Sequence, residues 1–565
     1  MKLSDYIVAF LQKKGIRHFF GYQGTMIAHV VDSIERNPET ENHSSYNEQG
    51  AAFAACGYAQ AKEECACAYA TSGPGAVNLL SGVADAYYDS LPVIFLTGQL
   101  NTYEYSGIEG LRQQGFQETD IVAMAKPVTK YAVQIRNPED IVVELNKAYH
   151  IATTGRKGPV LIDLPMNIQR SEVENPVYDM TFEDKHTDTA VVRQAADTIL
   201  EALEHAKRPM IMLGHGVDSH AAQQELISFA QKRQIPIITS VLAKSVLGYD
   251  NPLNFGCIGG AYGHRYANMI ANAKSDLLLC FGISLCTRQI GTKVYEFAKN
   301  AKIIQIDVDP AEINKNILVD CSIIGDVREV LKRLNARIEE HRHDEWDEEI
   351  KELKKKYPLK YDHSVLTGPY IMEEINRQTK GDAIIVTEVG QHQMWAAQYY
   401  KYLKPRRLLT SGGLGTMGYG LGASLGAKMG CPDKTVINIA GDGCFRMNMN
   451  ELATAARYNI PVIEVVINNH VLGMVRQWQT LFYGERYSQT ILDDSVDFVK
   501  LAEALGVEAC RVTKPEEFGP ALAHAVSLGK PYLIDCMIGS DDKVFPMVPA
   551  GKPIETVFDQ DDLDK

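Results

Sequence analysis

The sequence predicts an α/β protein with three doubly wound parallel-sheet domains, and three observations lead to this prediction. The chain has 565 residues, too many for a single hydrophobic core. Short apolar runs alternate with longer stretches of helical period, which is typical of parallel sheets covered by helices on both faces. Two polar stretches, residues 170–190 and 336–362, interrupt the alternation and predict connections between domains.

The apolar runs that predict strands fall into three groups along the chain. The first group is 65–71 and 92–97, with a predicted helix over 78–89 between them. The second group is 209–213, 235–239, 276–281 and 302–308, and the third is 383–387, 435–440, 461–467 and 532–537. The groups predict domains at residues 1–170, 188–335 and 363–540, followed by a C-terminal tail at 541–565.

Composition excludes several classes of function. The chain has 57 Lys and Arg against 71 Asp and Glu, a net charge of −14, which argues against nucleic-acid or anionic-membrane binding. No run approaches the roughly 18 consecutive apolar residues of a membrane helix. The 11 cysteines are scattered and form no Cys-x-x-Cys pair, which argues against a disulfide framework or a zinc site. We therefore expect a cytoplasmic protein.

One segment of the last group predicts a ligand site. The apolar strand at 435–440 runs directly into Gly441-Asp442-Gly443. A helical stretch at 448–458 follows, and the next strand, at 461–467, ends in Asn468-Asn469. Parallel strands end at the same edge of a sheet, where open α/β sheets bind ligands. The order of these elements resembles the GDG…NN motif of thiamine-diphosphate enzymes.

The residue types at this edge suit a magnesium ion shared with a diphosphate. The carboxylate of Asp442 and the amide oxygen of Asn469 are hard oxygen ligands of the kind that Mg²⁺ prefers. Gly441 and Gly443 remove Cβ atoms where the backbone has to approach a ligand closely. On its own the Gly-Asp-Gly triplet would fit an ordinary turn between a strand and a helix.

A second glycine pattern points to a different cofactor. Gly413 to Gly418 satisfies G-x-G-x-x-G, the fingerprint of dinucleotide-binding domains, and Asp433 lies 20 residues after Gly413. A dinucleotide-binding domain would place that acid at the end of the next strand, but Asp433 precedes the strand at 435–440. The dinucleotide interpretation therefore fails at the position that tests it.

Thiamine diphosphate also requires a carboxylic acid beside N1′ of its aminopyrimidine ring. That acid favours the imino tautomer, whose nitrogen removes the proton from the reactive thiazolium carbon. The acid has to be a glutamate in apolar surroundings, because burial favours the protonated carboxyl group. Glu48 lies in the mostly small and apolar segment 46–55. A glutamate at a helix start is ordinarily a cap, but beside the GDG…NN motif Glu48 becomes the predicted catalytic acid.

A resemblance covers essentially the whole chain and rests on long segments. They are residues 47–59, 71–99, 116–122, 158–165, 306–316, 389–400, 411–423 and 472–487, together with the GDG…NN motif. In these segments the chain resembles the catalytic subunit of acetolactate (acetohydroxyacid) synthase. The resemblance implies a carboligase of branched-chain amino acid biosynthesis that decarboxylates pyruvate and adds the two-carbon unit to a second 2-keto acid.

The resemblance also implies catalytic and substrate-binding residues. Glu48 matches the acid at N1′, and Phe116 and Gln117 match residues beside the reactive thiazolium carbon. Arg288 and Trp478 are similar to the residues that bind the second substrate, the arginine facing its carboxylate and the tryptophan its alkyl group. From local sequence alone, Arg288 would be a surface cation and Trp478 a core aromatic residue.

Cofactor contacts are implied in the same way. Asp442, Asn469 and the main-chain carbonyl of Val471 match the Mg²⁺ ligands, and Met417 matches the apolar wedge that bends the cofactor. The positions that match thiamine-diphosphate contacts are Gly390, Gln391, His392, Gly415, Met417, Gly441, Asp442, Gly443, Cys444, Asn469, Val471, Gly473 and Met474. The first domain would bind the pyrimidine and the last the diphosphate.

The central domain is similar to the FAD-binding domain of the family. Gly214, Gly216, Asp307 and Asp309 occupy matching positions, so FAD is an expected cofactor, although the net reaction has no redox step. Family membership further implies a homodimer or homotetramer, because Glu48 reaches a cofactor held mainly by the other chain. A separate regulatory subunit is a possible further partner.

Departures from the family pattern keep other acceptors open. Met166 stands where the family usually has Lys, and the segment between Gln99 and Phe116 is longer than usual. These differences suit a related carboligase that transfers the two-carbon unit to a keto sugar or another carbonyl in polysaccharide or secondary metabolism. A non-catalytic flavin- or nucleotide-binding protein is the third alternative, and the joint presence of Glu48, Asp442 and Asn469 argues against it.

Overall fold

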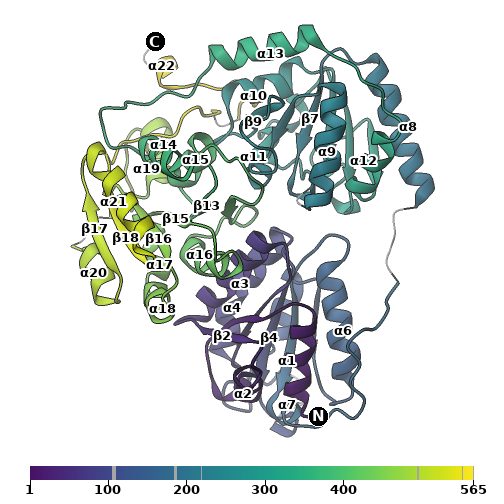
Figure 1. The fold of residues 1–565 in the computed structure, drawn as a ribbon, viewed down its shortest axis with the longest axis vertical. Coiled ribbons are helices and arrows are strands. Elements are labelled where there is room, and N and C mark those ends of the chain that lie inside the picture. Colours follow the sequence, from purple (N-terminus) through teal and green to yellow (C-terminus); the bar gives the residue numbers. More distant parts are fainter. Residues whose placement is uncertain are drawn as a thin grey trace.

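The computed structural model describes residues 1–104, 108, 110–183, 188–217, 219–492, 495–549 and 551–563. Three sheets, each of six strands, follow one another along the chain, and the strand pairs inside them are parallel (Figure 1). The predicted α/β class with three doubly wound parallel sheets is confirmed. The segment at 99–116, the connection at 170–190 and the C-terminal tail lie partly outside the described residues.

The N-terminal sheet has the strand order β2-β1-β3-β4-β6-β5. Its strands are β1 (His18–Gly21), β2 (Glu41–Ser44), β3 (Ala66–Ala70), β4 (Val93–Gln99), β5 (Tyr131–Gln134) and β6 (Val160–Pro165). Its helices are α1 (Leu3–Lys13), α2 (Ala28–Arg36), α3 (Glu48–Lys62), α4 (Pro74–Tyr88), α5 (Ile121–Ala125), α6 (Asp140–Thr153) and α7 (Met166–Gln169). Alternate residues of β3 enter two different hydrophobic cores, so both faces of the sheet are covered.

The central sheet has the order β12-β11-β10-β7-β8-β9. Its strands are β7 (Pro209–Leu213), β8 (Ile237–Thr239), β9 (Asn254–Cys257), β10 (Leu277–Phe281), β11 (Lys302–Asp307) and β12 (Cys321–Ile324). Its helices are α8 (Thr189–His205), α9 (His220–Arg233), α10 (Arg265–Met269), α11 (Thr287–Ile290), α12 (Val327–Asn335) and α13 (Asp344–Lys356). Ile211 and Leu213 enter one core, whereas Met210 and Met212 enter the other.

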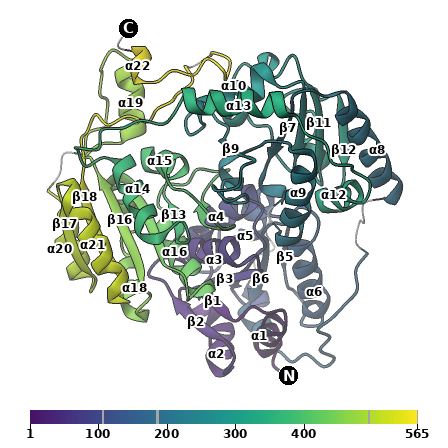
Figure 2. The same ribbon diagram turned by 45° about the horizontal axis from the view of Figure 1, so that its top comes forward.

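The C-terminal sheet has the order β14-β13-β15-β16-β18-β17 (Figure 2). Its strands are β13 (Ile384–Thr387), β14 (Leu408–Thr410), β15 (Val436–Gly441), β16 (Val462–Asn468), β17 (Glu508–Val512) and β18 (Tyr532–Met537). Its helices are α14 (Gly368–Thr379), α15 (Gln391–Tyr399), α16 (Tyr419–Gly430), α17 (Asp442–Asn448), α18 (Glu451–Tyr458), α19 (Gly473–Phe482), α20 (Phe498–Ala504) and α21 (Pro515–Leu528). A short helix, α22 (Gln560–Leu563), lies in the tail.

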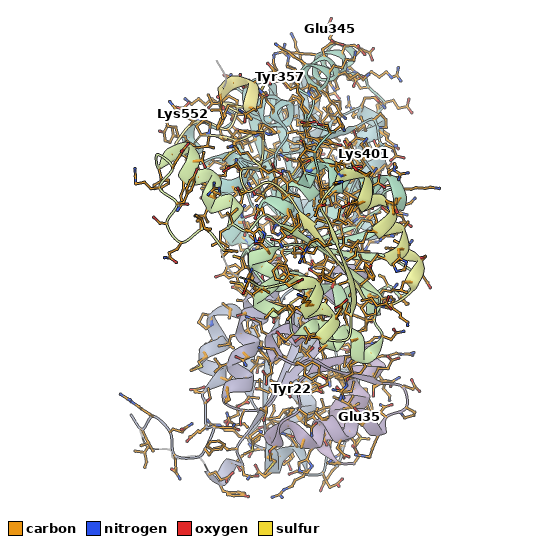
Figure 3. The ribbon with its side chains drawn as sticks, turned by 90° about the vertical axis from the view of Figure 1, so that its left-hand side faces the viewer. Tyr22, Glu35, Glu345, Tyr357, Lys401 and Lys552 are labelled. Atoms are coloured by element: carbon orange, nitrogen blue, oxygen red, sulfur yellow. The ribbon has the colours of Figure 1, made fainter. Side chains whose placement is uncertain are left out.

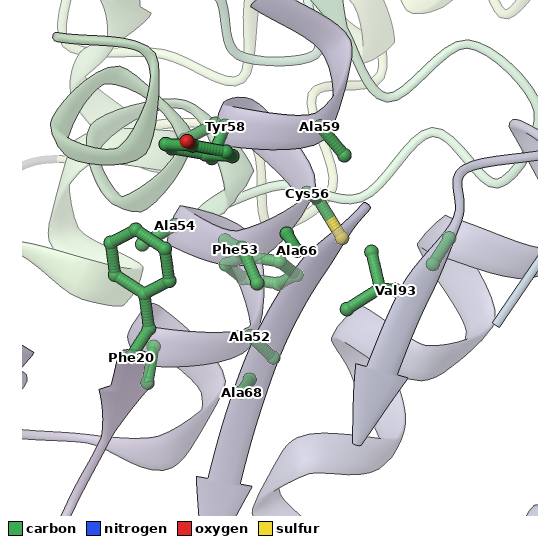
Figure 4. Close-up of a cluster of buried hydrophobic side chains, with 14 of the residues drawn as sticks. Phe20, Ala52, Phe53, Ala54, Cys56, Tyr58, Ala59, Ala66, Ala68 and Val93 are labelled. Atoms are coloured by element: carbon green, nitrogen blue, oxygen red, sulfur yellow. The ribbon is translucent and has the colours of Figure 1, made fainter. Parts of the chain in front are cut away.

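The N-terminal and C-terminal units share one hydrophobic core, in which α3 packs against α16. Their backbones approach so closely that a Cβ on Gly57 would lie 2.0 Å from the carbonyl oxygen of Ala423. A Cβ on Gly426 would lie 1.8 Å from the carbonyl oxygen of Ala54. Figure 4 shows the α3 side of this core. Glycine is therefore required on both helices of the α3–α16 contact.

The polar stretch at 336–362 lies on the outside of the molecule. Residues 336–362 contain α13, which buries Trp346 and Ile350 and exposes most of its charged side chains, as predicted for a solvated helix. Seen from the side, the N-terminal unit forms a lower lobe that carries Tyr22 and Glu35, while Tyr357 lies in the upper part (Figure 3).

Buried Glu464 in the middle of β16 leads to a prediction about pH and stability. Both of its carboxylate oxygens accept a hydrogen bond from Nδ2 of Asn438, at 3.0 and 2.9 Å, and burial raises the pKa of Glu464 well above its usual value. Because the pKa is higher in the folded chain, the stabilisation is complete below the unfolded pKa and is lost as pH rises towards the folded pKa. We expect the Tm of the wild type, relative to that of Glu464→Gln, to fall as pH rises from about 4 upwards, because about 4 is the pKa of an unfolded glutamate.

Thermal unfolding of both proteins across that pH range is the measurement. Glu508→Gln, an exposed glutamate on β17 of the same sheet, is the control and should keep the wild-type pH profile. Parallel pH profiles of Glu464→Gln and the wild type would show that folding does not raise the pKa of this carboxyl group.

Candidate active site

Asp442 and Asn469 emerge at the same edge of the C-terminal sheet, as predicted. β15 and β16 are adjacent and parallel, with Gly441 opposite Ile467. Asp442 is 1% exposed, and its Oδ2 atom is buried without a hydrogen-bond partner among the described residues. Burial raises the pKa of Asp442 to about 7. A cation at this position would satisfy the unpartnered oxygen and favour the carboxylate form.

The side chain of Asn469 fixes the turn that follows β16. Its Oδ1 accepts from the backbone N–H of Val471 at 3.2 Å, and its Nδ2 donates to Oε1 of Gln391 at 3.4 Å. His470, between Asn469 and Val471, has a left-handed φ of 57°. A Cβ on Gly473 would lie 2.0 Å from Oε1 of Gln391, so glycine is required there. The turn places the main chain of Val471 beside the amide of Asn469.

The two segments predicted to cradle the diphosphate are in contact. A Cβ on Gly390 would lie 2.6 Å, and a Cβ on Gly441 3.0 Å, from Cε1 of the His392 ring. The Sγ atom of Cys444 donates to the carbonyl oxygen of Val389 at 3.1 Å. Burial lowers the pKa of His392 to about 3, so its ring is neutral, and its Nε2 is buried without a partner among the described residues.

Met417 reaches the same place from the loop before α16. Its Cε lies 3.8 Å from the position that a Cβ on Gly443 would take. Gly415, two residues earlier, has a φ of 76°, which favours glycine. Met474 lies on α19 and packs, partly buried, against the core of the C-terminal unit. The predicted cofactor contacts of residues 390–474 therefore converge on the carboxyl edge of this sheet.

Glu48 is the first residue of α3 and is 8% exposed. Its Oε2 accepts a hydrogen bond from Nδ2 of Asn78 at 3.0 Å, and its Oε1 lies 2.8 Å from the position of a Cβ on Gly75. Gln117, with a left-handed φ of 65°, lies between β4 and α5 and packs against Gly73, which directly precedes α4. The start of α4 thus brings Glu48 and Gln117 to one place.

Phe116 lies next to Gln117 and is 81% exposed. A large aromatic side chain that is free of its own chain is available to a ligand or to another chain. The acid and the metal ligands lie on different sheets, and among the described residues no hydrogen bond joins Glu48 to Asp442 or Asn469. Each unit holds one half of the predicted site.

The predictions from sequence missed two carboxylates, one in α4 and one directly after it, that reach the C-terminal unit. Oδ1 of Asp85 accepts from the hydroxyl of Ser411 at 2.5 Å and from that of Thr416 at 3.1 Å. The two oxygens of Asp89 accept from the N–H groups of Gly412 and Gly413, at 2.9 and 2.7 Å. The helix that begins beside Glu48 therefore also holds the loop that leads to Met417.

Glu388 was missed as well. It is 1% exposed and accepts from the N–H groups of Gly418 and Gly420, at 2.7 and 2.8 Å, so it caps the start of α16. Burial raises the pKa of Glu388 to about 7. An acidic residue directly after the apolar run at 383–387 was the signal in the sequence, because that position lies at the carboxyl edge of the sheet.

Arg288 and Trp478 lie on different units. Arg288, on α11, is exposed, and its guanidinium carbon lies 5.6 Å from the centre of the Tyr262 ring. Trp478, on α19, is half-buried against Phe482, with ring centres 4.9 Å apart. Arg288 is thus an exposed cation, as local sequence alone favours, whereas Trp478 is not a fully buried core residue.

The C-terminal tail connects the surroundings of these two side chains. Gln477, which precedes Trp478, donates to the carbonyl oxygen of Val544 at 2.9 Å. The N–H of Val548 donates to the carbonyl oxygen of Gly260, whose own N–H donates to the carbonyl oxygen of Arg288, each at 3.0 Å. The described part of the tail is thus docked on both units.

The residues predicted to bind FAD gather at the carboxyl edge of the central sheet. The chain order reverses between β7 and β10, the switch point at which such sheets bind ligands. Gly214 and Gly216 follow β7, and a Cβ on Gly214 would lie 2.0 Å from the carbonyl oxygen of Gly282. Asp307 accepts from the N–H of Asp309 at 2.9 Å.

Asp309 itself is engaged by the N-terminal unit. Its Oδ2 pairs with Nη1 of Arg156 at 2.9 Å, and the same nitrogen pairs with Glu312 at 2.7 Å. One of the residues predicted to bind FAD, Asp309, therefore also forms an ion pair with the N-terminal unit. Nδ1 of His215, between the two glycines after β7, is buried without a partner in the described part of the chain, so one polar atom at this edge remains to be satisfied.

Comparison with known proteins identifies the family. Three family models of thiamine pyrophosphate enzymes match this chain. The N-terminal TPP binding domain matches residues 1–124, the central domain residues 196–334 and the C-terminal TPP binding domain residues 388–536. The probable acetolactate synthase large subunit of Methanocaldococcus jannaschii is 40% identical over 98% of this chain and 94% of its own length. The chain belongs to the acetolactate synthase family of thiamine pyrophosphate enzymes.

Other members of the acetolactate synthase family match equally broadly. The acetolactate synthase large subunit of Corynebacterium glutamicum is 41% identical over 96% of this chain and 88% of its own length. That of Lactococcus lactis is 37% identical over 97% of this chain and 94% of its own length. The predicted family is confirmed, and with it the enzyme class and thiamine diphosphate as the cofactor.

The residues at the carboxyl edge of the C-terminal sheet fit thiamine diphosphate. The glycines at 390, 441, 443 and 473 are partly exposed and carry no Cβ, so a ligand can approach their backbone. The unpartnered Oδ2 of Asp442 faces this edge. Acceptors for a cation and exposed backbone for a diphosphate are thus present together.

The contact between Asp85 and the loop before Met417 leads to a further prediction. Asp85→Ala removes the acceptor of two hydroxyl groups, and a hydrogen bond of this kind contributes about 1–2 kcal/mol. We expect the affinity for thiamine diphosphate to fall about tenfold, measured by activation at increasing cofactor concentration. Asp85→Asn keeps the acceptor oxygen and should bind like the wild type. Equal loss in both variants would mean that the loop does not depend on this hydrogen bond.

Proposed function

We propose that this chain is a thiamine-diphosphate-dependent carboligase of acetolactate synthase type, which decarboxylates pyruvate and joins the two-carbon unit to a second 2-keto acid. The observation that carries the proposal is the buried, unpartnered carboxylate oxygen of Asp442 at the edge where Asn469 emerges, in a chain that matches acetolactate synthases over nearly its full length. We also propose domain limits at 170–188 and 335–363, where the connections between the three sheets lie.

Mg²⁺ is the proposed metal of this site. Asp442, Asn469 and the main-chain carbonyl of Val471 would hold it together with the diphosphate. The backbone at 389–392 and 441–444 would contact the phosphate oxygens. Met417 would support the cofactor from the apolar side. The chain's own contribution here is a charged, closely fitted cradle that fixes the orientation of the bound group.

Thiamine diphosphate, when bound, supplies the carbon nucleophile that attacks the keto group of pyruvate. Glu48 would hold a proton at its carboxyl group next to the pyrimidine, with Asn78 fixing the orientation of that carboxyl group. Gln117 and Phe116 would line the space for the first substrate. Arg288 would bind the carboxylate of the second substrate, and Trp478 would contact its alkyl group.

A homodimer completes the site in this proposal. Glu48 and Asp442 lie on different sheets of one chain, and Phe116 stands 81% exposed beside Gln117. A second copy would place its C-terminal unit against the N-terminal unit that carries Glu48. Pairing of dimers into tetramers and binding of a regulatory subunit are compatible extensions, because the matched relatives are named large subunits.

FAD is the proposed ligand of the central unit. The switch point between β7 and β10, the glycines at 214 and 216 and the unpartnered Nδ1 of His215 support it. Asp307 and Asp309 would contact the same group from β11. The test is the visible flavin absorption of the purified chain, and its return after removal and addition of FAD.

The eleven cysteines, all described, are free, which supports a reducing compartment such as the cytoplasm. No helix in the described part of the chain has the length and apolar character needed to cross a membrane.

The test of the proposed function is product analysis by mass spectrometry. The chain is incubated with pyruvate, thiamine diphosphate and Mg²⁺, with a second 2-keto acid or a nucleotide keto sugar as acceptor. Acetolactate or its homologue as the main product is the expected result. If pyruvate is consumed without forming acetolactate, and a carboligation product forms only when the keto sugar is added, the keto-sugar alternative would replace this function. The comparisons do not favour that alternative.

A further inference from the structure

Two histidines and a glutamate face one another on the N-terminal sheet, away from the proposed active site. β1 and β2 are parallel neighbours, with His18 opposite Glu41 and Phe20 opposite His43. Because side chains alternate along a strand, His18, Glu41 and His43 point to the same side of the sheet. The cluster begins at the amino ends of these strands, whereas Glu48 follows the carboxyl end of β2.

Three donor atoms converge in this cluster. Nδ1 of His18 lies 3.0 Å from Nε2 of His43, and Oε2 of Glu41 lies 3.6 Å from each of these nitrogens. A tetrahedral Zn²⁺ with bonds of about 2.0–2.2 Å keeps its ligand atoms about 3.3–3.5 Å apart. The triangle of donor atoms therefore has nearly the size that such an ion requires.

We propose that His18, Glu41 and His43 form a binding site for a divalent transition-metal ion, and that Zn²⁺ is the ion it takes. Two neutral imidazoles and one carboxylate are a ligand set that zinc uses in proteins, whereas Mg²⁺ and Ca²⁺ prefer oxygen ligands throughout. Glu41 has a side chain that is 67% exposed, so a fourth position is open to water. The site is distinct from the magnesium site proposed at Asp442.

Hydrogen bonding alone does not account for the arrangement. Burial lowers the pKa of His43 to about 4 and lowers that of His18, which Lys62 and Arg17 lower further, against the opposing effect of Glu41. One ring can donate to the other, but the carboxylate of Glu41 stands 3.6 Å from both nitrogens, beyond the length of a hydrogen bond.

Aromatic side chains hold the two imidazoles in place. Phe20 stacks on His43, with ring centres 5.6 Å apart, and Tyr58 lies 5.5 Å from the ring of His18. Figure 4 shows Phe20 and Tyr58 side by side in the core between β1 and α3. Such packing orients the ligands before an ion arrives, which reduces the entropy lost on binding.

The C-terminal unit contributes to the surroundings of the cluster. Tyr458, the last residue of α18, packs edge-on against His43, with ring centres 5.6 Å apart, and its hydroxyl accepts from the N–H of Ser44 at 2.9 Å. An ion bound here would therefore brace the edge strand β2 where the N-terminal and C-terminal units meet.

The experiment measures metal binding directly. The full-length chain is treated with a chelator, supplied with thiamine diphosphate and Mg²⁺, and titrated with Zn²⁺ by calorimetry, and retained zinc is counted by elemental mass spectrometry after gel filtration. One equivalent should bind and raise the Tm. Glu41→Gln should weaken this binding at least about tenfold, and Glu41→Gln combined with His18→Gln should abolish it.

The variants avoid the buried His43, so the fold is kept. Glu39→Gln changes an exposed carboxylate near Arg17 and should bind zinc like the wild type. Asp442→Ala should also keep this equivalent, because the two sites are separate. Replacing zinc by Co²⁺ should give the visible absorption of a tetrahedral ion in the wild type and in these two controls, and not in the double variant. Zinc binding that is absent from the wild type, or equal in the double variant, would overturn the proposal.

Discussion

Glu48→Gln is expected to abolish carboligation while the chain stays folded. The substitution keeps the size of a side chain that is 8% exposed, and its amide oxygen can still accept from Asn78. It removes the group that exchanges a proton with the pyrimidine. Loss of a general acid or base costs typically 10²- to 10⁴-fold in rate, and here the first step of every turnover depends on it. We expect a fall in kcat at the upper end of that range.

The measurement is acetolactate formation at saturating cofactor and pyruvate, with Tm and circular dichroism as checks of folding. Glu64→Gln, an exposed glutamate just beyond the same helix, is the matched control and should retain full activity. Wild-type activity of Glu48→Gln would assign the proton transfer to another group. A change in activity together with a large fall in Tm would instead mean that Glu48 acts through the fold.

Asp442→Ala is expected to prevent cofactor binding at ordinary Mg²⁺ concentrations. The carboxylate is 1% exposed, and its Oδ2 has no partner among the described residues, so its removal costs the protein little internal bonding. The bound metal, in contrast, loses its charged protein ligand. We expect at least about a 100-fold loss of affinity for thiamine diphosphate, which corresponds to about 3 kcal/mol.

Calorimetric titration with thiamine diphosphate at fixed Mg²⁺ tests this expectation. Asp433→Asn is the control, because Asp433 is exposed in the loop before β15 and should leave affinity unchanged. That control also tests the dinucleotide interpretation of Gly413–Gly418, in which Asp433 would be essential. Affinity that survives Asp442→Ala would place the metal elsewhere.

The sequence predicted the inner strands of the sheets better than the outer ones. The strands β3, β4, β7, β10, β15 and β16 are mostly apolar runs, because both faces of an inner parallel strand are buried. The edge strands β2, β5, β9, β12, β14 and β17 were not predicted. β2 reads Glu-Asn-His-Ser and β5 Tyr-Ala-Val-Gln, with partly exposed side chains and no apolar run. Neighbouring strands, and not local preference, make such segments extended.

The sequence also predicted too few helices after the Gly-Asp-Gly motif. The sequence predicted one helical stretch at 448–458, whereas the structure has α17 from Asp442 to Asn448 and then α18 from Glu451 to Tyr458. The helix thus begins at the predicted metal ligand itself. Gly441, in an extended conformation, ends the strand and begins the helix without an intervening loop.

The candidate site was predictable where its residues are adjacent to motifs, and not where they act from another unit. Asp442 and Asn469 follow two apolar strands, so parallel topology alone places them at one edge. Asp85 and Asp89 look like ordinary helix acids in the sequence. Their contacts with Ser411 and Gly412 are 326 and 323 residues away along the chain, and only the tertiary fold shows them.

The close contact of α3 and α16 has a mechanical consequence. Where the carbonyl oxygen of Ala423 lies against Gly57, no side chain separates the two helices. Neither helix can slide or roll by a fraction of a turn without a backbone collision. Glu48 at the start of α3 and the loop that ends at Gly418 therefore move together as one rigid body. Any opening and closing of the enzyme therefore has to leave this contact unchanged.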